Sequence, residues 1–367
     1  MLTIDGSYGE GGGQVLRTSL TLSAVTDQPV HIVNIRAGRR KPGLRPQHLT
    51  GVRAVARVCD AEVEGAKLDS QKLTFAPRSA PQTGTYTFDV AQAAKGGSAG
   101  AMSLIFQTVL LPLALQSRRT GTVTEGTSHL ALRGGTHVAW SPPFDYLKRV
   151  YLPTLARMGV QAKVRIEKWG WYPLGGGVVE ATIAASGKQQ AADTLSGLDL
   201  RQRGRLLRVR GVSASSNLPK HIRMRQERAA LQVLRSNGVN ARIEVIDAPS
   251  KGQGTVVFLW AEFENAVAGF TSLGERGKPA ERVAEEAARD LLGFLHSDAA
   301  LDRHLADQLV LPMALADGPS RFTTEEVTQH LLTNAWVVNQ FLPGRVRVEG
   351  VEGEPGACRT SVRPAPP

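Results

Sequence analysis

A glutamate set among glycines, close to the start of the chain, is the residue whose surroundings most directly predict chemistry. The stretch GSYGEGGGQVLR (6–17) surrounds Glu10 with four glycines, directly before an apolar segment with helical spacing. Glycine lets the backbone approach a ligand closely, and the start of a helix presents free N–H groups that suit phosphate. A carboxylate repels phosphate, but it would fit beside one if a divalent cation lay between them, since Mg²⁺ or Mn²⁺ prefers oxygen ligands. The stretch is equally consistent with a tight turn that enters a packed helix.

The standard nucleotide motifs do not account for these glycines. The chain contains neither a Walker motif nor a Rossmann G-x-G-x-x-G, and no G-x-S-x-G of a serine hydrolase. Histidines offer a second source of chemistry, and the most informative is His330 in EEVTQHLLTNAWVVNQFLP. A lone histidine on a helix with an apolar face usually packs or caps, so on residue types alone both roles stay open.

Charge indicates a polyanionic partner. The net charge is +11 and the isoelectric point is near 10.0, which favours nucleic acid. One basic cluster lies in RAGRRKPGLRPQHLTG (36–51), and a second is RQRGRLLRVR (201–210). A solvated surface is as plausible for the second cluster as a nucleic-acid contact. The low aromatic content of 5% argues against a platform that stacks many bases.

A repeated unit positions these groups. A helix, a turn and two short strands recur at 49–77, 151–184 and 226–262, and Gly159 and Gly238 end two of the helices. A second, apolar helix recurs at 14–24, 101–115 and 305–315, so the unit is predicted to be helix–strand–helix–strand–strand. The predicted fold class is α+β, with these modules forming four-stranded sheets that carry helices on one face, plus a small inserted α/β domain. We place the large domain at 1–185 and 275–367 and the inserted domain at 186–274.

The two cysteines, Cys59 and Cys358, form no metal motif, and the absence of a disulfide framework favours the cytoplasm. No secretory signal is recognisable. The longest apolar stretch, Leu104 to Leu115, is too short to cross a bilayer. No membrane association is therefore expected.

Five separated motifs carry a family resemblance. The segments DGSYGEGGGQVLR, IRAGRRKPGLRPQHL, GWYPLGGG, HLADQLVLPMALA and HLLTN resemble, in order and over nearly the whole chain, those of RNA 3′-terminal phosphate cyclases. The resemblance implies ATP-dependent conversion of an RNA 3′-phosphate to a 2′,3′-cyclic phosphodiester. RNA 3′-phosphate ends, and DNA 3′-phosphate ends as a further option, would be the partners of a monomer or homodimer.

By the same resemblance, His330 attacks the α-phosphate of ATP and becomes a covalent adenylate, which suits a neutral imidazole. Glu10 holds the divalent metal, Mg²⁺ or Mn²⁺, and the glycines bring backbone close to the phosphates. Arg17, Arg36 and Arg39 clamp the RNA terminal phosphate, and Gln47 and His48 complete the site wall. ATP is held by Gln107, His304, Leu305, Ala306, Asp307 and Gln308.

One departure concerns His304, because the family often has a tyrosine there that stacks on adenine. Three other functions compete with the cyclase. A related branch without cyclase activity serves in ribosomal RNA processing, but it lacks the nucleophilic histidine. A non-catalytic RNA-binding protein explains the charge but not the motifs. The layout also resembles that of enolpyruvyl transferases, but no motif for phosphoenolpyruvate is recognisable. Incubation with α-labelled ATP and metal distinguishes the cyclase from these alternatives, because only the cyclase is expected to become labelled.

Overall fold

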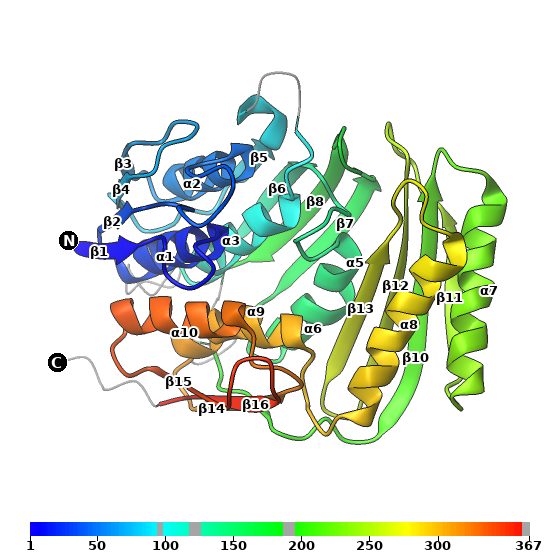
Figure 1. Cartoon of the computed structure of the whole chain (residues 1–367). Coiled ribbons are helices and arrows are strands. Elements are labelled where there is room, and N and C mark those ends of the chain that lie inside the picture. The colour runs from blue at the N-terminus through cyan, green and yellow to red at the C-terminus, as the bar shows by residue number, and fades with distance from the viewer. Residues whose placement is uncertain (94–97, 117–125, 186–194, 362–367) are drawn as a thin grey trace.

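The chain is described by a computed structural model that covers residues 1–93, 98–116, 126–185 and 195–361 (Figure 1). The strands of this part of the chain form four sheets, each with four strands. Three of the sheets share one strand order and belong to the repeated modules, and the fourth differs. The α+β class and the four-stranded sheets predicted from the sequence are confirmed.

The first module alternates strands and helices before it closes on a pair of strands. Its elements are β1 (Leu2–Asp5), α1 (Gly13–Thr26), β2 (Val30–Val33), α2 (Pro46–Val58), β3 (Glu62–Glu64) and β4 (Leu73–Ala76). The strand order is β1-β2-β4-β3, with β1 parallel to β2 and the other pairs antiparallel. Each module therefore begins with a parallel strand that the sequence pattern did not reveal.

The second and third modules repeat this order. The second has β5 (Thr85–Asp89), α3 (Met102–Ala114), β6 (Thr127–Gly134), α5 (Phe144–Tyr146), α6 (Leu152–Ala156), β7 (Ala162–Lys168) and β8 (Gly177–Ala184). The third has β9 (Asp199–Leu200), α9 (Arg303–Leu315), β14 (Ser320–Thr324), α10 (Gln329–Phe341), β15 (Val346–Glu349) and β16 (Gly356–Thr360). Their strand orders are β5-β6-β8-β7 and β9-β14-β16-β15.

The small domain interrupts the third module between β9 and α9. It contains β10 (Leu206–Ser216), α7 (Lys220–Ser236), β11 (Ala241–Asp247), β12 (Gly254–Phe263), β13 (Val267–Leu273) and α8 (Ala280–His296). The interpretation of 226–262 as a further copy of the module is wrong, because β11 pairs with β10 and not with β12. Its apolar spacing matches because any helix that covers a sheet has this periodicity.

The limits of the small domain at 186 and 274 stay a prediction. The strand β9 pairs in parallel with β14, so it belongs to the third module. The helix α8 packs on β12, β13 and α7, and its apolar residues share one core with theirs. This packing favours a small domain that extends to the end of α8 at His296.

The helices of the three modules face one another and the sheets lie outside them. Helix α1 contacts α2, α3 and α10, and α10 contacts α9. In Figure 1, α10 lies beside α1 at one end of the molecule, while α7 of the small domain lies at the other end. Gly159 and Gly238 adopt positive φ values of 101° and 74°, as predicted for residues that end helices. Both cysteines are buried. Within the described residues, no helix combines the length and the apolarity needed to traverse a bilayer.

Candidate active site

The glycine-rich loop is fitted to the side chains around it. Gly9 and Gly11 have φ values of 62° and 54°, a region that other residues rarely adopt. A Cβ atom on Gly9 would lie 2.2 Å from Oγ1 of Thr333, and one on Gly13 would lie 2.3 Å from Nε2 of His48. These glycines therefore make room for side chains of α10 and α2, a role that spacing alone did not indicate.

Two contacts hold this loop and α1 against α10. The ring of Tyr8 stacks on Trp336 with centroids 3.9 Å apart. The buried amide of Asn334 accepts from the hydroxyl of Thr18 at 2.7 Å and donates to the carbonyl oxygen of Asp307 at 2.8 Å. Asn334 thus joins α10 to both α1 and α9, one turn after His330.

His330 lies in the first turn of α10 with its side chain 42% exposed. The hydroxyl of Thr328 caps this helix by accepting from the backbone N–H of Leu331. Nδ1 of His330 lies 2.8 Å from Oε1 of Glu10, whose Oε2 accepts from Arg39 at 2.5 Å. The sequence placed Glu10 and His330 in one site, and the structure brings them into direct contact.

This contact determines which nitrogen of His330 is available. With the Nδ1 proton donated to Glu10, the lone pair of the neutral ring lies on Nε2. Nε2 has no hydrogen-bond partner among the residues that the structure describes. Burial lowers the pKa of His330 below its usual range, and Glu10 opposes this effect. A neutral imidazole held by a carboxylate is suited to nucleophilic attack.

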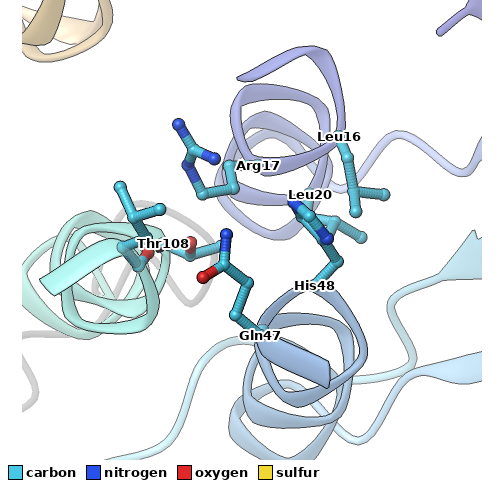
Figure 2. Close-up of a pocket in the computed structure, with 8 residues that line it drawn as sticks. Leu16, Arg17, Leu20, Gln47, His48 and Thr108 are labelled. Carbon is cyan, nitrogen blue, oxygen red and sulfur yellow. Dashed lines mark hydrogen bonds between the residues drawn. The ribbon is translucent and has the colours of Figure 1, made fainter. Parts of the chain in front are cut away.

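A pocket between α1, α2 and α3 collects several predicted residues. Its lining includes Arg17 of α1, Gln47 and His48 of α2, and Thr108 of α3 (Figure 2). Nδ1 of His48 accepts from the backbone N–H of Arg45 at 3.2 Å. Burial, followed by the charges of Arg36, Arg17 and Arg45, holds the pKa of His48 well below its usual range. His48 is therefore neutral and contributes a positioned ring.

The three arginines predicted to clamp the phosphate have different surroundings in the structure. Arg39 is exposed and reaches Glu10, whereas Nη1 of Arg36 donates to the carbonyls of Lys41 and Gly43 at 2.7 and 2.9 Å. Part of the Arg36 guanidinium thus shapes its own loop. Burial lowers the pKa of Arg17 to about 10, far above neutrality, so this side chain is a cation facing the pocket.

Helix α9 carries most of the predicted nucleotide residues. Gln107 of α3 donates to Gln308 at 2.5 Å, and Gln308 donates to the carbonyl of His304 at 2.7 Å. His304 as a whole residue is exposed. The side chains of Leu305 and Ala306 are fully buried in the large core, so only their backbone could contact a nucleotide.

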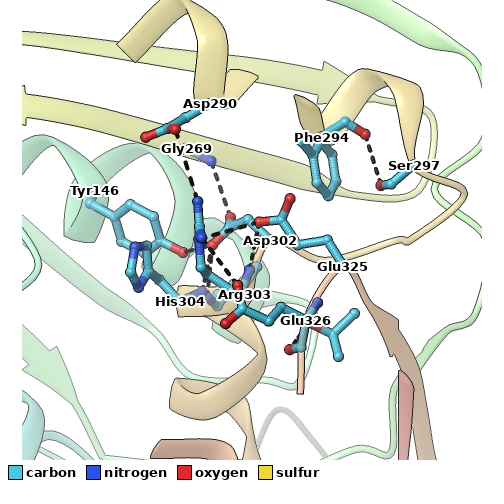
Figure 3. Close-up of polar contacts among 12 residues, drawn as sticks. Tyr146, Gly269, Asp290, Phe294, Ser297, Asp302, Arg303, His304, Glu325 and Glu326 are labelled. Atoms are coloured by element: carbon cyan, nitrogen blue, oxygen red, sulfur yellow. Dashed lines mark hydrogen bonds and ion pairs between the residues drawn. The ribbon is translucent and has the colours of Figure 1, made fainter. Parts of the chain in front are cut away.

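Asp302 is the N-cap residue of α9 and connects this helix to the small domain. Its Oδ1 accepts from the backbone N–H groups of His304 and Leu305, at 3.0 and 2.9 Å, and from the Tyr146 hydroxyl at 2.7 Å. Its Oδ2 accepts from the backbone of Gly269 in β13 at 3.1 Å (Figure 3). A fully buried carboxylate with four donors rigidly sets the start of α9.

Burial raises the pKa of the half-buried Asp307 to about 8, against an ordinary value of 3.8. Because the folded-state pKa is raised, the stability contribution is complete below about pH 4 and is lost as pH rises through about 8. We therefore expect Asp307→Asn to gain stability relative to the unmodified protein between about pH 5 and pH 9. Urea unfolding at both pH values measures this difference.

The exposed Asp60→Asn variant removes a carboxylate outside this site and is the control for this comparison. A constant difference for Asp307→Asn across the range would contradict a raised pKa.

The second basic cluster is largely neutralised within the fold. Arg201, Arg205 and Arg208 form ion pairs with Asp199, Glu264 and Glu262. Arg203 donates to four carbonyl oxygens at the end of α8 and just beyond it. Most of the arginines in this cluster are therefore engaged within the fold, which argues against a nucleic-acid contact along this strand.

The starts of four helices share the site. His48, His304 and His330 lie in the opening turns of α2, α9 and α10, and Arg17 lies at the start of the second turn of α1. Helix N-termini carry partial positive charge and favour anions. No group of three or more His, Cys, Asp or Glu side chains able to hold a metal exists in the described ranges. A cation at Glu10 would therefore take its remaining ligands from water or from a bound phosphate, as Mg²⁺ commonly does.

Comparison with known proteins agrees with this geometry. The family model "RNA 3′-terminal phosphate cyclase" matches residues 8–348. A protein of that name from Methylococcus capsulatus is 51% identical over 100% of this chain and 98% of its own. Another from Pyrobaculum neutrophilum is 46% identical over 94% of this chain and 94% of its own. The chain belongs to the RNA 3′-terminal phosphate cyclase family.

Membership of the cyclase family confirms the resemblance read from the five motifs. Among solved structures, the enolpyruvyl transferase NikO from Streptomyces tendae matches with a TM-score of 0.26 and 10% identity, over 97% of this chain and 65% of its own. Three positioning residues escaped the sequence reasoning: Tyr8, Asp302 and Asn334. Asp302 had a recognisable signal, because an aspartate two residues before His304 is a typical helix N-cap.

Proposed function

We propose that this chain converts an RNA 3′-terminal phosphate into a 2′,3′-cyclic phosphodiester at the expense of ATP, through a covalent adenylate on His330. The observation that carries the proposal is the contact between Glu10 and His330 among four helix N-termini in a chain of the cyclase family. The neutral Nε2 has the lone pair, the exposure and the electropositive surroundings that attack on a phosphate requires.

The reaction consists of three successive steps, and in each a nucleophile attacks a phosphorus atom and displaces a leaving group. Nε2 of His330 bonds to the α-phosphorus of ATP while the bond to pyrophosphate breaks. The RNA 3′-phosphate oxygen then attacks this phosphorus, and the bond to Nε2 breaks. The neighbouring 2′-hydroxyl finally loses its proton, attacks the RNA phosphorus and releases AMP. The last step gains from proximity because the reacting groups share one ribose.

The residues divide into two sets in this proposal. The nucleotide lies along α9, with Gln107 and Gln308 as a bonded pair and the His304 ring available for stacking on adenine. The RNA 3′-phosphate lies on the α1 and α2 side, facing Arg17 and Arg39. Glu10 stands between them and would hold Mg²⁺ or Mn²⁺, which would withdraw charge from the phosphates.

Alanine variants can distinguish residues that bind the nucleotide from residues that bind the RNA end. Arg39→Ala should retain most adenylate formation but weaken binding of 3′-phosphate RNA more than of 3′-hydroxyl RNA. A charge-assisted contact is worth about 1.5–3 kcal/mol, which corresponds to a roughly ten- to hundredfold loss of affinity. Arg36→Ala should show the same selectivity together with a less stable loop, because Arg36 also bonds two carbonyls of that loop. Titration with RNAs that differ only at the 3′ end measures both.

Arg40→Ala and Lys41→Ala are the matched controls, since both side chains are exposed in the same loop. We expect them to weaken both RNAs equally and to reduce the salt dependence. Equal losses for both ends with Arg39→Ala would contradict the phosphate clamp.

The main competing function is non-catalytic RNA binding in ribosomal RNA processing. It predicts RNA affinity without any label on the protein after incubation with α-labelled ATP and metal. The small number of cysteines, Cys59 and Cys358, both buried, supports our proposal of a cytoplasmic enzyme. Loss of the label from the protein after addition of DNA with a 3′-phosphate end tests whether DNA ends are accepted. Sedimentation distinguishes a monomer from a homodimer.

A further inference from the structure

The motif GWYPLGGG (170–177) has no role in the site described so far. The residues around its start are buried: Trp169, directly before the motif, stacks on His137 with centroids 4.0 Å apart, and Nε1 of Trp171 donates to Ser216 at 2.8 Å. The residues that follow are not, since Tyr172 is 78% exposed and Leu174 is 62% exposed. A rigid buried base thus presents two large side chains to solvent.

A third exposed side chain comes from the segment bonded to this loop. His137 and Trp171 form a parallel bridge, and the backbone N–H of Thr136 donates to the carbonyl of Gly170 at 2.9 Å. Three residues after His137, Trp140 is 99% exposed and has a φ of 63°. A bulky residue rarely adopts this conformation, and it persists where the surroundings impose it. We call Trp140, Tyr172 and Leu174 the aromatic patch.

The loops that carry the aromatic patch are continuous with the RNA side of the active site. Gly175 packs so closely on Ser98 that a Cβ would lie 2.5 Å from the carbonyl oxygen of Ser98. The same short segment continues to Ala101, whose backbone N–H donates to Gln47 at 3.0 Å. Ala101 also bridges to Gly135, just before Thr136. Gln47 lines the pocket of Arg17 in Figure 2.

The charge of these loops suits a polyanion. The bonded segments 98–101, 135–143, 169–177 and 248–254 contain no aspartate or glutamate. They include the exposed Lys251, whose side chain approaches Gly176, and Lys168 directly precedes Trp169. Exposed aromatic rings on segments that contain no carboxylate, in a chain with a net charge of +11, match the composition of surfaces that bind single-stranded nucleic acid.

We infer that the aromatic patch stacks the bases of the single-stranded RNA that precedes the 3′-terminal phosphate. Two rings can engage only a few bases, which agrees with the low aromatic content of the chain. Stacking tolerates any base because each has a π face, so this surface would add affinity without selecting sequence. The inference rests on the proposed function, because it takes the RNA end to lie beside Arg17 and Arg39.

The test measures how affinity depends on RNA length. The full chain carrying Trp140→Ala, Tyr172→Ala or both is titrated with a dinucleotide 3′-phosphate and with an unstructured 3′-phosphate RNA of about ten nucleotides, within the usual span of such sites. Each change should weaken the longer RNA by roughly five- to hundredfold and leave the dinucleotide unchanged. Trp140→Phe and Tyr172→Phe should retain most of the affinity, because a ring remains. Leu207→Ala, an exposed apolar position on β10, is the control.

Several results would overturn the inference: unchanged affinity for the longer RNA, equal losses for both RNAs, or phenylalanine variants as weak as the alanine variants. A change in sedimentation without a change in RNA affinity would instead assign the aromatic patch to contact between copies of the chain. Adenylate formation without RNA is measured on the same samples. Normal labelling with no length effect rejects the aromatic patch alone, whereas no labelling of the unmodified protein rejects the proposed function.

Discussion

His330→Ala protein is expected to take up no label from α-labelled ATP, whereas the unmodified protein becomes labelled. The variant lacks the nitrogen that forms the bond to phosphorus, and no other described histidine pairs with Glu10. The label should survive denaturation and be lost in acid, as expected of a phosphoramidate. Gel autoradiography of the denatured protein measures this, and cyclisation of 3′-phosphate RNA should fall below detection in parallel.

His304→Ala is the matched control for this experiment, because His304 is an exposed histidine at the start of the neighbouring helix. It should still be labelled, but at higher ATP concentration, since it would lose only a stacking contact. Label on His330→Ala protein would show that the nucleophile lies elsewhere. Failure of the unmodified protein to label would favour the non-catalytic RNA-binding function.

Glu10→Ala is expected to slow adenylate formation by roughly 10²- to 10⁴-fold, the range for loss of a group that orients or activates a catalytic imidazole. The structure assigns the carboxylate a contact with Nδ1 of His330, and the proposed function adds a metal. Glu10→Gln separates these roles, because its amide oxygen can still accept from Nδ1 but is a poor metal ligand. Rates of labelling across a range of Mg²⁺ or Mn²⁺ concentrations measure both.

Recovery of Glu10→Ala at high metal concentration would identify metal binding as the main role, and near-normal rates for Glu10→Gln would identify orientation of His330. Arg39→Ala is the control for the ion pair itself, since it removes the other partner of Glu10 and should leave the labelling largely intact. Unchanged rate and unchanged metal dependence in Glu10→Ala would assign this residue to the turn alone.

Much of the candidate site could be proposed from the sequence because its members lie in compact local motifs. Glycines around Glu10, the segment that contains His330 and the loop that carries Arg39 are each readable within a dozen residues. Helices and strands follow from local periodicity, and Gly159 and Gly238 mark helix ends because positive φ values favour glycine. The same locality explains the mistaken module at 226–262, since periodicity predicts a strand but not its partner.

The tertiary structure decided which charges remain free and which side chains face solvent. Arg205 and Arg208 appear as part of a basic run, but Glu262 and Glu264 neutralise them from across the sheet. Asp302 resembles an ordinary helix cap, yet its donors include Tyr146 and Gly269 from other parts of the fold.

The sequence by itself supplied the members of the candidate site, that is, an imidazole, a carboxylate and several arginines. Only the tertiary structure decided that Glu10 bonds to Nδ1 of His330, that Arg36 turns back onto its own loop, and that Trp140 and Tyr172 stay exposed. The physical reason is that residue type and spacing are local properties. Hydrogen-bond partners and exposure instead depend on segments far apart in the chain that packing brings together.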